Sequence, residues 1–351
     1  MRKMYDSIVS YLALVLLAAI PLIVTALGGM FTERGGVTNI SLEGIMIIGA
    51  FVGLVTVNKL PASWFSSNFV LYLCGMIAAV IGGLIFAGIH AIAAIKMKAN
   101  QIISATAINT LAPALALFLT MSLTLGEAQG SDKILVNGTR FIIERVPLLA
   151  DIPFIGEVFF TNVYPSLYFG IAILVISSIV LYKTKFGLRL RACGENPHAA
   201  DAAGINIYKM RYQGVFISGI LASLGGYFLV TSFTNEFDAT VSGFGFLAIA
   251  VMIFGNWKPK NIAFTALFFA ALLTLSKGVA FFPALENWLY PPIPADTPPE
   301  QIAFLTYVST KVIPNIISML PYIATLAVLV LSSKKSAAPK ASGLIYDKGE
   351  R

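Results

Sequence analysis

The chain has 351 residues, of which 57% are hydrophobic and only 12% charged, and its mean hydropathy is +0.82. Soluble domains carry about a quarter charged residues, so this composition leaves too little polar surface to cover a water-soluble globule. The composition therefore excludes the soluble classes and predicts an all-α polytopic membrane protein. In such a protein the net charge of +7 reports how the loops are distributed across the bilayer and does not indicate nucleic-acid binding.

A spanning helix needs about 20 apolar residues, and nine apolar runs meet or approach this length. In chain order they cover residues 5–32, 40–57, 69–95, 100–125, 163–182, 212–232, 243–257, 261–282 and 312–332. The run 243–257 is short, which indicates a broken or re-entrant element. Pro21 and Pro113 lie inside helical runs and are expected to kink them. We therefore predict a bundle of about nine spanning helices, within a range of eight to ten.

Lysine and arginine gather in alternate loops. Segment 183–211 carries six basic and two acidic residues, and segment 333–351 carries five basic and two acidic residues. Two short turns are also basic, through Lys96, Lys98, Lys258 and Lys260. All of these lie on one side if nine spans alternate, and the positive-inside rule makes that side the cytoplasm. We therefore predict one transmembrane domain over residues 1–332, with a cytoplasmic loop at 183–211, and a basic cytoplasmic tail at 333–351.

The opposite loops are acidic. Loop 126–162 carries three basic and five acidic residues, and loop 283–311 carries one basic and three acidic residues, so both are predicted to be extracytoplasmic. Nine spans and a cytoplasmic tail place the N-terminus outside as well. A second crossing hidden in residues 5–32 would give ten spans and place it inside. That run makes only about 42 Å of helix, which is too short for two complete crossings.

A polar stretch separates the first two runs and reads Glu33-Arg-Gly-Gly-Val-Thr-Asn-Ile-Ser-Leu-Glu-Gly. The paired glycines break the helix, after which Asn39 or Ser41 can cap the next one. Glu43 then falls in the first turn, where the helix dipole favours a carboxylate. Two interpretations stay open. The stretch is either a cytoplasmic turn with a capped helix or a broken segment packed at the centre of the bundle, where polar residues line the path of a solute.

The run 100–125 carries a stripe of uncharged polar residues. Gln101, Ala105 and Asn109 are spaced i, i+4 and i+8, so they share one helix face. Amides on such a face can bind an uncharged polar solute or make hydrogen bonds to neighbouring helices. The candidates for lining the translocation pathway are Asn39, Ser41, Glu43, Gln101 and Asn109.

The sequence lacks the motifs for ATP hydrolysis, metal binding and a disulfide framework, and almost lacks the ionisable residues of an ion-coupled carrier. No P-loop sequence occurs, so the chain is predicted not to be an enzyme and no catalytic residue is assigned. Cys74, Cys193, His90 and His198 have no metal-ligand spacing, so no metal site and no disulfide framework is predicted. His90 is expected to be a packed polar residue. The spans carry almost no ionisable residue away from their ends, whereas a proton- or sodium-coupled carrier would need one.

The basic loop contains a helix signal of its own. Asn196 followed by Pro197 is typical of an N-cap and the first helical position. The alanines up to Ala203 favour helix, and Gly204 is a natural stop. Because a helix of about two turns is unstable alone, it must pack on this protein's own spans or on another subunit.

Three stretches of this loop carry a resemblance to a known family. Gly187-Leu-Arg-Leu-Arg-Ala, Gly194-Glu-Asn-Pro and Ala203-Gly-Ile-Asn look like the coupling-helix segment of ABC importer permeases, in the family that includes ribose and branched-chain amino-acid permeases. The stretch Glu33–Gly44 narrows the resemblance to nucleoside-type members. Gln101-Ile-Ile-Ser-Ala-Thr-Ala-Ile-Asn is similar to a second polar segment of that family, which usually has glycine where this chain has Ala105.

The resemblance implies a type II importer permease in the bacterial plasma membrane. A cytoplasmic ABC ATPase would dock on the coupling helix and would bind the ATP and Mg²⁺, so this chain needs no cofactor. A second permease subunit, expected to be a paralogue, would complete the pathway, and an extracytoplasmic solute-binding lipoprotein would deliver the solute. The residues that the resemblance assigns to ATPase coupling are Glu195, Asn196, Pro197, Ala200 and Gly204.

The resemblance also implies that the solute is a nucleoside. A permease for ribose-like simple sugars stays open, because the uncharged stripe suits both solutes. A different class, a gradient-driven carrier or channel acting alone, stays open as well.

Overall fold

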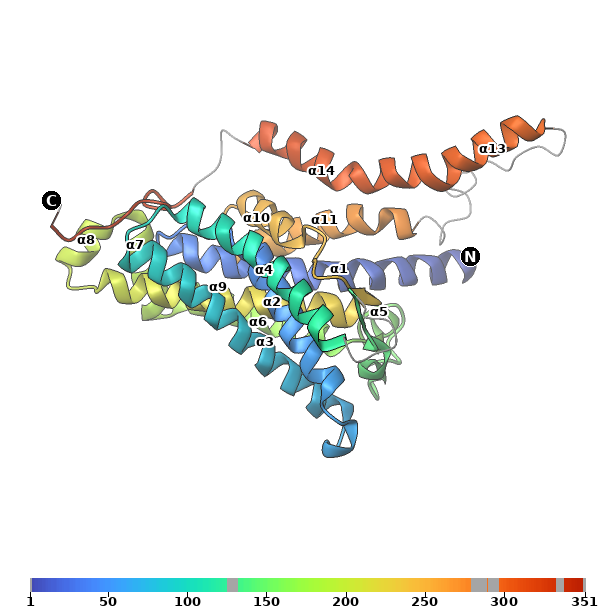
Figure 1. Cartoon of the computed structure of the whole chain (residues 1–351), viewed down its shortest axis with the longest axis horizontal. Helices are drawn as coiled ribbons and strands as arrows, with labels where there is room; N and C mark the ends of the chain where they lie inside the picture. The colour runs from blue at the N-terminus through green and yellow to red at the C-terminus, as the bar shows by residue number, and fades with distance from the viewer. Residues whose placement is uncertain (1, 125–131, 279–288, 290–296, 333–337, 350–351) are drawn as a thin grey trace. The chain divides into compact units, whose positions relative to one another are not determined.

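The computed structural model describes residues 2–124, 132–278, 289, 297–332 and 338–349 of the chain. Its long helices are α1 (Arg2–Arg34), α2 (Leu42–Lys59), α3 (Asn68–Ala91), α4 (Gln101–Thr124), α6 (Pro165–Lys183), α9 (Ile207–Ser232), α11 (Pro259–Gly278) and α14 (Ile313–Ser332), labelled in Figure 1 where there is room. The shorter helices are α5 (Ile155–Phe159), α7 (Lys185–Glu195), α8 (Pro197–Ala202), α10 (Phe244–Phe254) and α13 (Pro299–Tyr307). Single tighter or wider turns form η1 (Ala62–Trp64), η2 (Ile92–Lys96), η3 (Gly138–Phe141) and η5 (Val308–Val312).

Two pairs of short antiparallel strands are the β-structure of the described residues. β1 (Ile134–Leu135) pairs with β4 (Glu236–Phe237), and β2 (Ile143–Arg145) pairs with β3 (Thr161–Val163). β1, β2 and the first two residues of β3 lie in the predicted outer loop 126–162, which therefore contains regular structure.

Every predicted apolar run falls on a helix. The described residues contain seven helices that are long and apolar enough to cross a membrane, together with the shorter apolar helices Phe244–Phe254 and Pro259–Leu275. The all-α polytopic prediction is confirmed. Residues 5–32 lie in the single helix α1, which continues through Pro21, just as α4 continues through Pro113. The run 243–257 corresponds to α10, whose 11 residues are too few for a complete span, as predicted.

The prediction that residues 183–211 form a loop with one short helix is corrected by the structure, in which this segment is almost wholly helical. Three side chains cap successive helices here by accepting a hydrogen bond from the backbone N–H three residues on. The acceptor and donor pairs are Thr184 with Gly187 (3.2 Å), Asn196 with Ala199 (3.0 Å) and Asn206 with Lys209 (2.9 Å). As a result α9 begins at Ile207, before the apolar run that predicted it.

The last predicted span also begins earlier than expected. α13, η5 and α14 follow one another directly from Pro299 to Ser332, so the final part of the predicted outer loop 283–311 is helical. Pro299 occupies the start of α13, where its fixed φ and missing N–H suit the first turn. Parts of the predictions lie outside the described residues: 125 and 279–282 of two spans, 126–131, 283–288 and 290–296 of the outer loops, and 333–337 and 350–351 of the tail.

The chain divides into two compact units, and the prediction of one domain over residues 1–332 stays a prediction. The first unit contains residues 1–19, 143–163 and 267–334. Within it the hydroxyl of Tyr11 on α1 donates to the carbonyl of Ala271 on α11 at 2.7 Å. The backbone N–H of Phe154 donates to the hydroxyl of Tyr5 at 2.9 Å.

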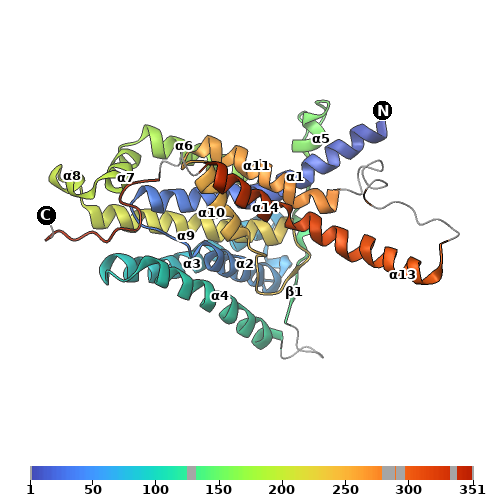
Figure 2. The same ribbon diagram turned by 90° about the horizontal axis from the view of Figure 1, so that it is seen from above.

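The second unit contains residues 20–142, 164–266 and 335–351, and it holds all ten residues predicted for the pathway and for coupling. Its core is formed by α2, α3 and α9, which lie side by side in Figure 1 and Figure 2, with α4 packed on α2. Small residues allow the close approach of these helices, as is common in membranes. Gly226 of α9 lies directly against the backbone of Met46 on α2, and Gly49 of α2 lies against Ser223 on α9, so a Cβ at either glycine would clash.

Candidate translocation and coupling site

The helix break predicted after Arg34 is present inside the second unit. α1 ends at Arg34 and α2 begins at Leu42, and the residues between them, 35–41, are called the connector below. Gly36 has φ +85°, a left-handed conformation that favours glycine. The connector is buried, since Asn39 and Ser41 are 2% and 0% exposed. The interpretation as a broken segment packed inside the bundle is therefore the one that the structure supports.

Asn39 organises the connector locally. Its Oδ1 accepts from the backbone N–H of Ser41 at 3.0 Å and from the Ser41 hydroxyl at 2.5 Å. Its Nδ2 donates to the hydroxyl of Ser218 on α9 at 3.2 Å. Neither Asn39 nor Ser41 makes a side-chain cap to α2, so the capping predicted for them is wrong. Asn39 instead closes a turn and ties it to α9.

The amide stripe of α4 faces the connector. Gln101 Oε1 accepts from the backbone N–H of Thr38 at 2.7 Å. Asn109 Oδ1 accepts from the N–H of Gly44 at 2.9 Å, and its Nδ2 donates to the carbonyl of Ile40 at 2.9 Å. These side chains supply partners that helix would otherwise provide, which non-helical backbone at membrane depth requires.

Glu43 connects the start of α2 to the start of α10. Its two carboxylate oxygens accept from the backbone N–H groups of Gly243 at 2.9 Å and Gly245 at 2.6 Å. The first turn of a helix leaves such N–H groups without partners and carries positive partial charge, so a carboxylate is favourable there. Glu43 therefore acts on the dipole of α10, a distant helix, in addition to standing in the first turn of its own helix as predicted.

His90 also binds the connector, which composition alone did not reveal. Its Nδ1 lies 3.1 Å from the hydroxyl of Ser104 and its Nε2 lies 3.2 Å from the carbonyl of Thr38. It is fully buried and is a packed polar residue, as expected. The structure thus brings the five pathway candidates together around one broken segment, although their role in lining a pathway stays a prediction.

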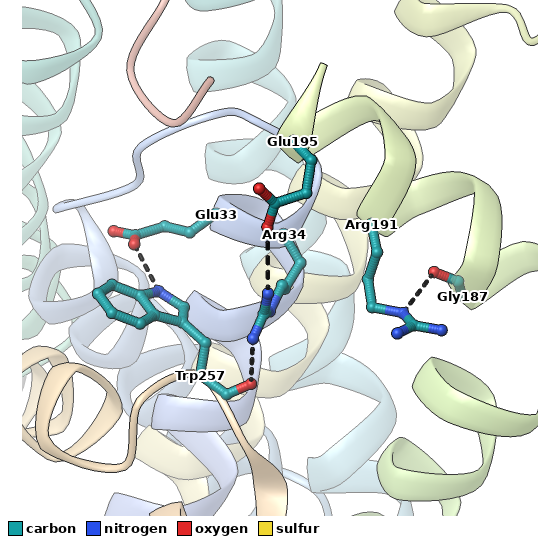
Figure 3. Close-up of polar contacts among 6 residues, drawn as sticks. All are labelled: Glu33, Arg34, Gly187, Arg191, Glu195 and Trp257. Atoms are coloured by element: carbon teal, nitrogen blue, oxygen red, sulfur yellow. Dashed lines mark hydrogen bonds and ion pairs between the residues drawn. The ribbon is translucent and has the colours of Figure 1, made fainter. Parts of the chain in front are cut away.

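A second polar cluster lies where α1 ends, and Figure 3 draws its contacts. Trp257 Nε1 donates to Glu33 Oε2 at 2.7 Å. Arg34 donates from Nη2 to the carbonyl of Trp257 at 3.2 Å, and its Nη1 lies 3.7 Å from Glu195 Oε1. Glu33, Arg34, Glu195 and Trp257 are called the Arg34 cluster below. Trp257 was not predicted as a site residue, because its partners are more than two hundred positions away in the sequence.

The predicted coupling helix is present as α8. The Asn196 side chain caps it, Pro197 is its first residue, and Gly204 follows with φ +81°. Ala200 is buried on this chain, whereas Ala199, Ala202 and Ala203 are exposed. Part of the alanine surface is therefore free to contact another molecule.

Two hollows flank the residues that follow α8. One of about 760 Å³ is lined by Phe186, Leu188, Arg189, Ala192, Ala203, Gly204, Ile205, Asn206, Lys209, Met210 and Gln213. The other, of about 440 Å³, is lined by Asp201, Ala202, Gly204, Ile205, Asn206, Ile207, Tyr208, Tyr346 and Lys348. The second hollow is therefore lined both by α8 and by the tail of the chain.

Residues 338–349 of the predicted tail form an ordered strap across this region. The N–H of Ala341 donates to the carbonyl of Gly194 at 2.8 Å, and Arg211 Nη1 donates to the carbonyl of Leu344 at 2.9 Å. The ring of Tyr346 packs against the rings of His198 and Tyr208, at centroid distances of 5.3 and 5.5 Å. Lys98 and Asp347 form an ion pair at the far end of the strap, which lowers the pKa of the exposed Asp347 carboxyl.

Cys193 lies beneath the strap at the end of α7 and is 0% exposed. Burial raises the pKa of its thiol to about 11, so it is a structural thiol with little thiolate at neutral pH. Within the described ranges, no three His, Cys, Asp or Glu side chains are grouped as a metal site would require.

The geometry of a broken, amide-held segment inside an apolar bundle is typical of a membrane transport protein. The chain matches the family described as branched-chain amino acid transport system / permease component over residues 11–292. It belongs to this family. The permease is therefore a multi-pass membrane protein and one component of a transport system.

Three curated relatives resemble the permease along most of its length. Guanosine ABC transporter permease protein NupQ of Bacillus subtilis is 41% identical over 96% of this chain and 96% of its own length. Nucleoside ABC transporter permease protein NupC of Lactococcus lactis is 37% identical over 95% and 96%. Putative glucose ABC transporter permease protein TsgC13 of Haloferax volcanii is 29% identical over 89% and 88%. No solved structure matches the permease.

Proposed function

We propose that this chain is the transmembrane permease subunit of an ATP-driven ABC importer that translocates nucleosides. The observation that carries the proposal is the similarity to the guanosine and nucleoside permease proteins at 41% and 37% identity over nearly the whole chain. The site agrees in its chemistry, because amides and hydroxyls surround the connector and suit an uncharged, polar solute.

Gln101 is the best-placed pathway residue in this proposal. Its Oε1 holds the connector, whereas its Nε2 is buried without a hydrogen-bond partner among the described residues. An unsatisfied buried donor costs about 1–3 kcal/mol, and a passing ribose hydroxyl or base carbonyl could accept from it. Asn39, Ser41, Glu43 and Asn109 would then shape the path by holding the connector in place.

Energy would enter through α8. A cytoplasmic ABC ATPase would bind ATP and Mg²⁺ and dock on Glu195, Asn196, Pro197, Ala200 and Gly204, where exposed alanines adjoin the larger hollow. A second permease subunit, a paralogue in the proposal, and an extracytoplasmic solute-binding lipoprotein would complete the transporter in the bacterial plasma membrane. The basic loops would face the cytoplasm with the C-terminus, and the N-terminus would lie outside.

Uptake of labelled guanosine in cells tests this function. Deleting the permease should abolish high-affinity uptake, and unlabelled nucleosides should compete while glucose should not. Competition by glucose alone would favour the second candidate, a sugar permease, which the 29% identity to the putative glucose permease protein supports. Solute flux through liposomes that contain this chain alone would instead favour a gradient-driven carrier.

Coupling is tested by Ala199→Asp and Ala202→Asp, which alter the exposed surface of α8. Both should leave the protein in the membrane and separate ATP hydrolysis from uptake. Wild-type uptake in both variants would contradict the assignment of α8 to ATPase docking.

A further inference from the structure

The short helix α10 is held at both ends by residues from the same stretch of chain. At its start, Glu43 accepts from Gly243 and Gly245. Just after its end, Trp257 contacts Glu33 and Arg34. The stretch from Glu33 to Glu43, which contains the connector, thus grips the helix at two points. Because α10 spans only 11 residues, it can follow this stretch as one rigid piece.

The same stretch rests directly on the coupling region. Glu195, the last residue of α7, lies 3.7 Å from Arg34, and the next residue caps α8. Gly194 packs so closely on the carbonyl of Arg34 that a Cβ there would clash. Gly35 likewise lies against Leu190 of α7, whose Cδ1 would be 3.0 Å from an added Cβ. A displacement of α8 therefore reaches the end of α1 through packed contacts.

Arg34 contacts both the coupling region, at Glu195, and the corner after α10, at Trp257. Its side chain is 13% exposed, and its guanidinium contacts Glu195 on one side and the Trp257 carbonyl on the other. The contact with the Trp257 carbonyl is a charge-assisted hydrogen bond, which is stronger than a neutral one, and the contact with Glu195 is an ion pair. In Figure 3 the guanidinium lies between the two. The nearby Arg191 instead donates to the carbonyl of Gly187 in its own helix and lies over the ring of Tyr182 on α6.

We propose that Arg34 is a positioning residue that transmits movement of the coupling helix α8 to α10, and through α10 to the buried Glu43. The proposal rests on the proposed function, in which a partner ATPase moves α8. Movement of α8 displaces Glu195 and, through the ion pair, Arg34. Arg34 then displaces the corner at Trp257, and α10 shifts relative to the Glu43 carboxylate at its other end.

Charge exchange tests the link in the complete transporter, reconstituted in liposomes with guanosine as the probe. Arg34→Glu and Glu195→Arg should each lower guanosine transported per ATP hydrolysed by about tenfold, within the range of known coupling free energies. The double exchange rebuilds the ion pair with opposite polarity. It should not restore the ratio, because a glutamate at position 34 has no donor for the Trp257 carbonyl. Arg191→Gln is the matched control, because Arg191 lies on α7 with Glu195 but does not pair with it. This variant should leave the ratio unchanged.

A second readout follows α10 itself. Phe246 on α10 is 50% exposed, and the maleimide reaction rate of a Phe246→Cys variant should change when ATP hydrolysis is trapped. Adding Arg34→Gln should abolish this change while ATP hydrolysis continues. A merely structural role for Arg34 would lower protein yield without separating these two measurements.

The outcomes distinguish the two proposals. Normal transport per ATP in both single exchanges, or full recovery of the ratio in the double exchange, would overturn the role of Arg34. A loss of ATPase stimulation in both single exchanges would assign the ion pair to docking and would overturn transmission. If the wild-type transporter moves no nucleoside, the proposed function fails, yet the ATP-dependent change at Phe246→Cys still tests the link.

Discussion

The carboxylate of Glu43 should be a main support of α10. Glu43→Ala removes both acceptors for the buried start of the helix, the N–H groups of Gly243 and Gly245. Each buried N–H that loses its partner costs about 1–3 kcal/mol, so the two together cost about 2–6 kcal/mol. The loss is partly offset because a carboxylate that is 7% exposed no longer has to be kept away from water.

Glu43→Gln separates the two hydrogen bonds. Its amide oxygen can still accept from one N–H, whereas the NH₂ group faces the other, so about half the cost of the alanine variant is expected. Thermal unfolding of the purified protein in one detergent measures the difference. The melting temperature should decrease in the order wild type, Glu43→Gln, Glu43→Ala.

Glu236→Ala is the matched control. Glu236 is also a glutamate of the second unit, but its carboxylate is half exposed and pairs with Lys133 at 2.8 Å. Exposed ion pairs contribute little to stability, so its melting temperature should stay at the wild-type value. If Glu43→Ala also melts like the wild type, Glu43 does not hold α10, and the two-ended attachment of that helix is wrong.

Three further results are expected. Asn109→Leu leaves two backbone groups, including the Ile40 carbonyl, without partners, so the protein should lose about 2–6 kcal/mol of stability and melt lower in detergent. Tyr346→Ala should release the strap and speed its cleavage by trypsin, whereas the exposed Ile345→Ala should not. Cys193, with a pKa of about 11, holds about a thousandth of its thiol as thiolate at pH 8. Mass spectrometry should detect its maleimide adduct only after unfolding, and rapid labelling of the folded protein would contradict its burial.

The amide stripe shows what periodicity can predict. The spacing of Gln101 and Asn109 places them on one face of a helix, and both do face the same neighbour. What they bind could not be predicted, because the partners are backbone groups that become available only when the connector is not helical. A sequence pattern identifies polar residues in an apolar helix, but tertiary packing decides which groups they satisfy.

The basic segment shows where hydropathy misleads. A search for apolar runs detects neither α7, which is amphipathic, nor the start of α9, where Lys209 and Arg211 interrupt the apolar residues. Capping residues carried the missing signal, because Thr184 and Asn206 stand at the starts of those helices just as Asn196 does at α8. Only Asn196 was recognised, since a proline follows it.

The Arg34 cluster had no local signal at all. Glu33 and Trp257 are 224 positions apart, and a tryptophan such as Trp257 is by itself typical of a membrane interface. The cluster depends on the corner between α10 and α11, where Asn256 and Trp257 both have positive φ. Such a conformation in two adjacent non-glycine residues is unfavourable, and the contacts of Trp257 with Glu33 and Arg34 help to hold it.

Stability and coupling should therefore be separable in this permease. Connector contacts from Asn109 and Gln101 hold a buried, non-helical segment in place, so their loss should be measured first as a lower melting temperature. The Arg34–Glu195 pair joins a partly exposed carboxylate to the end of a helix, so its loss should cost little stability and should appear mainly in transport per ATP. Because both sets of contacts act on one stretch of chain, a variant that loosens the connector should also weaken transmission, whereas a variant of the ion pair should leave the connector intact.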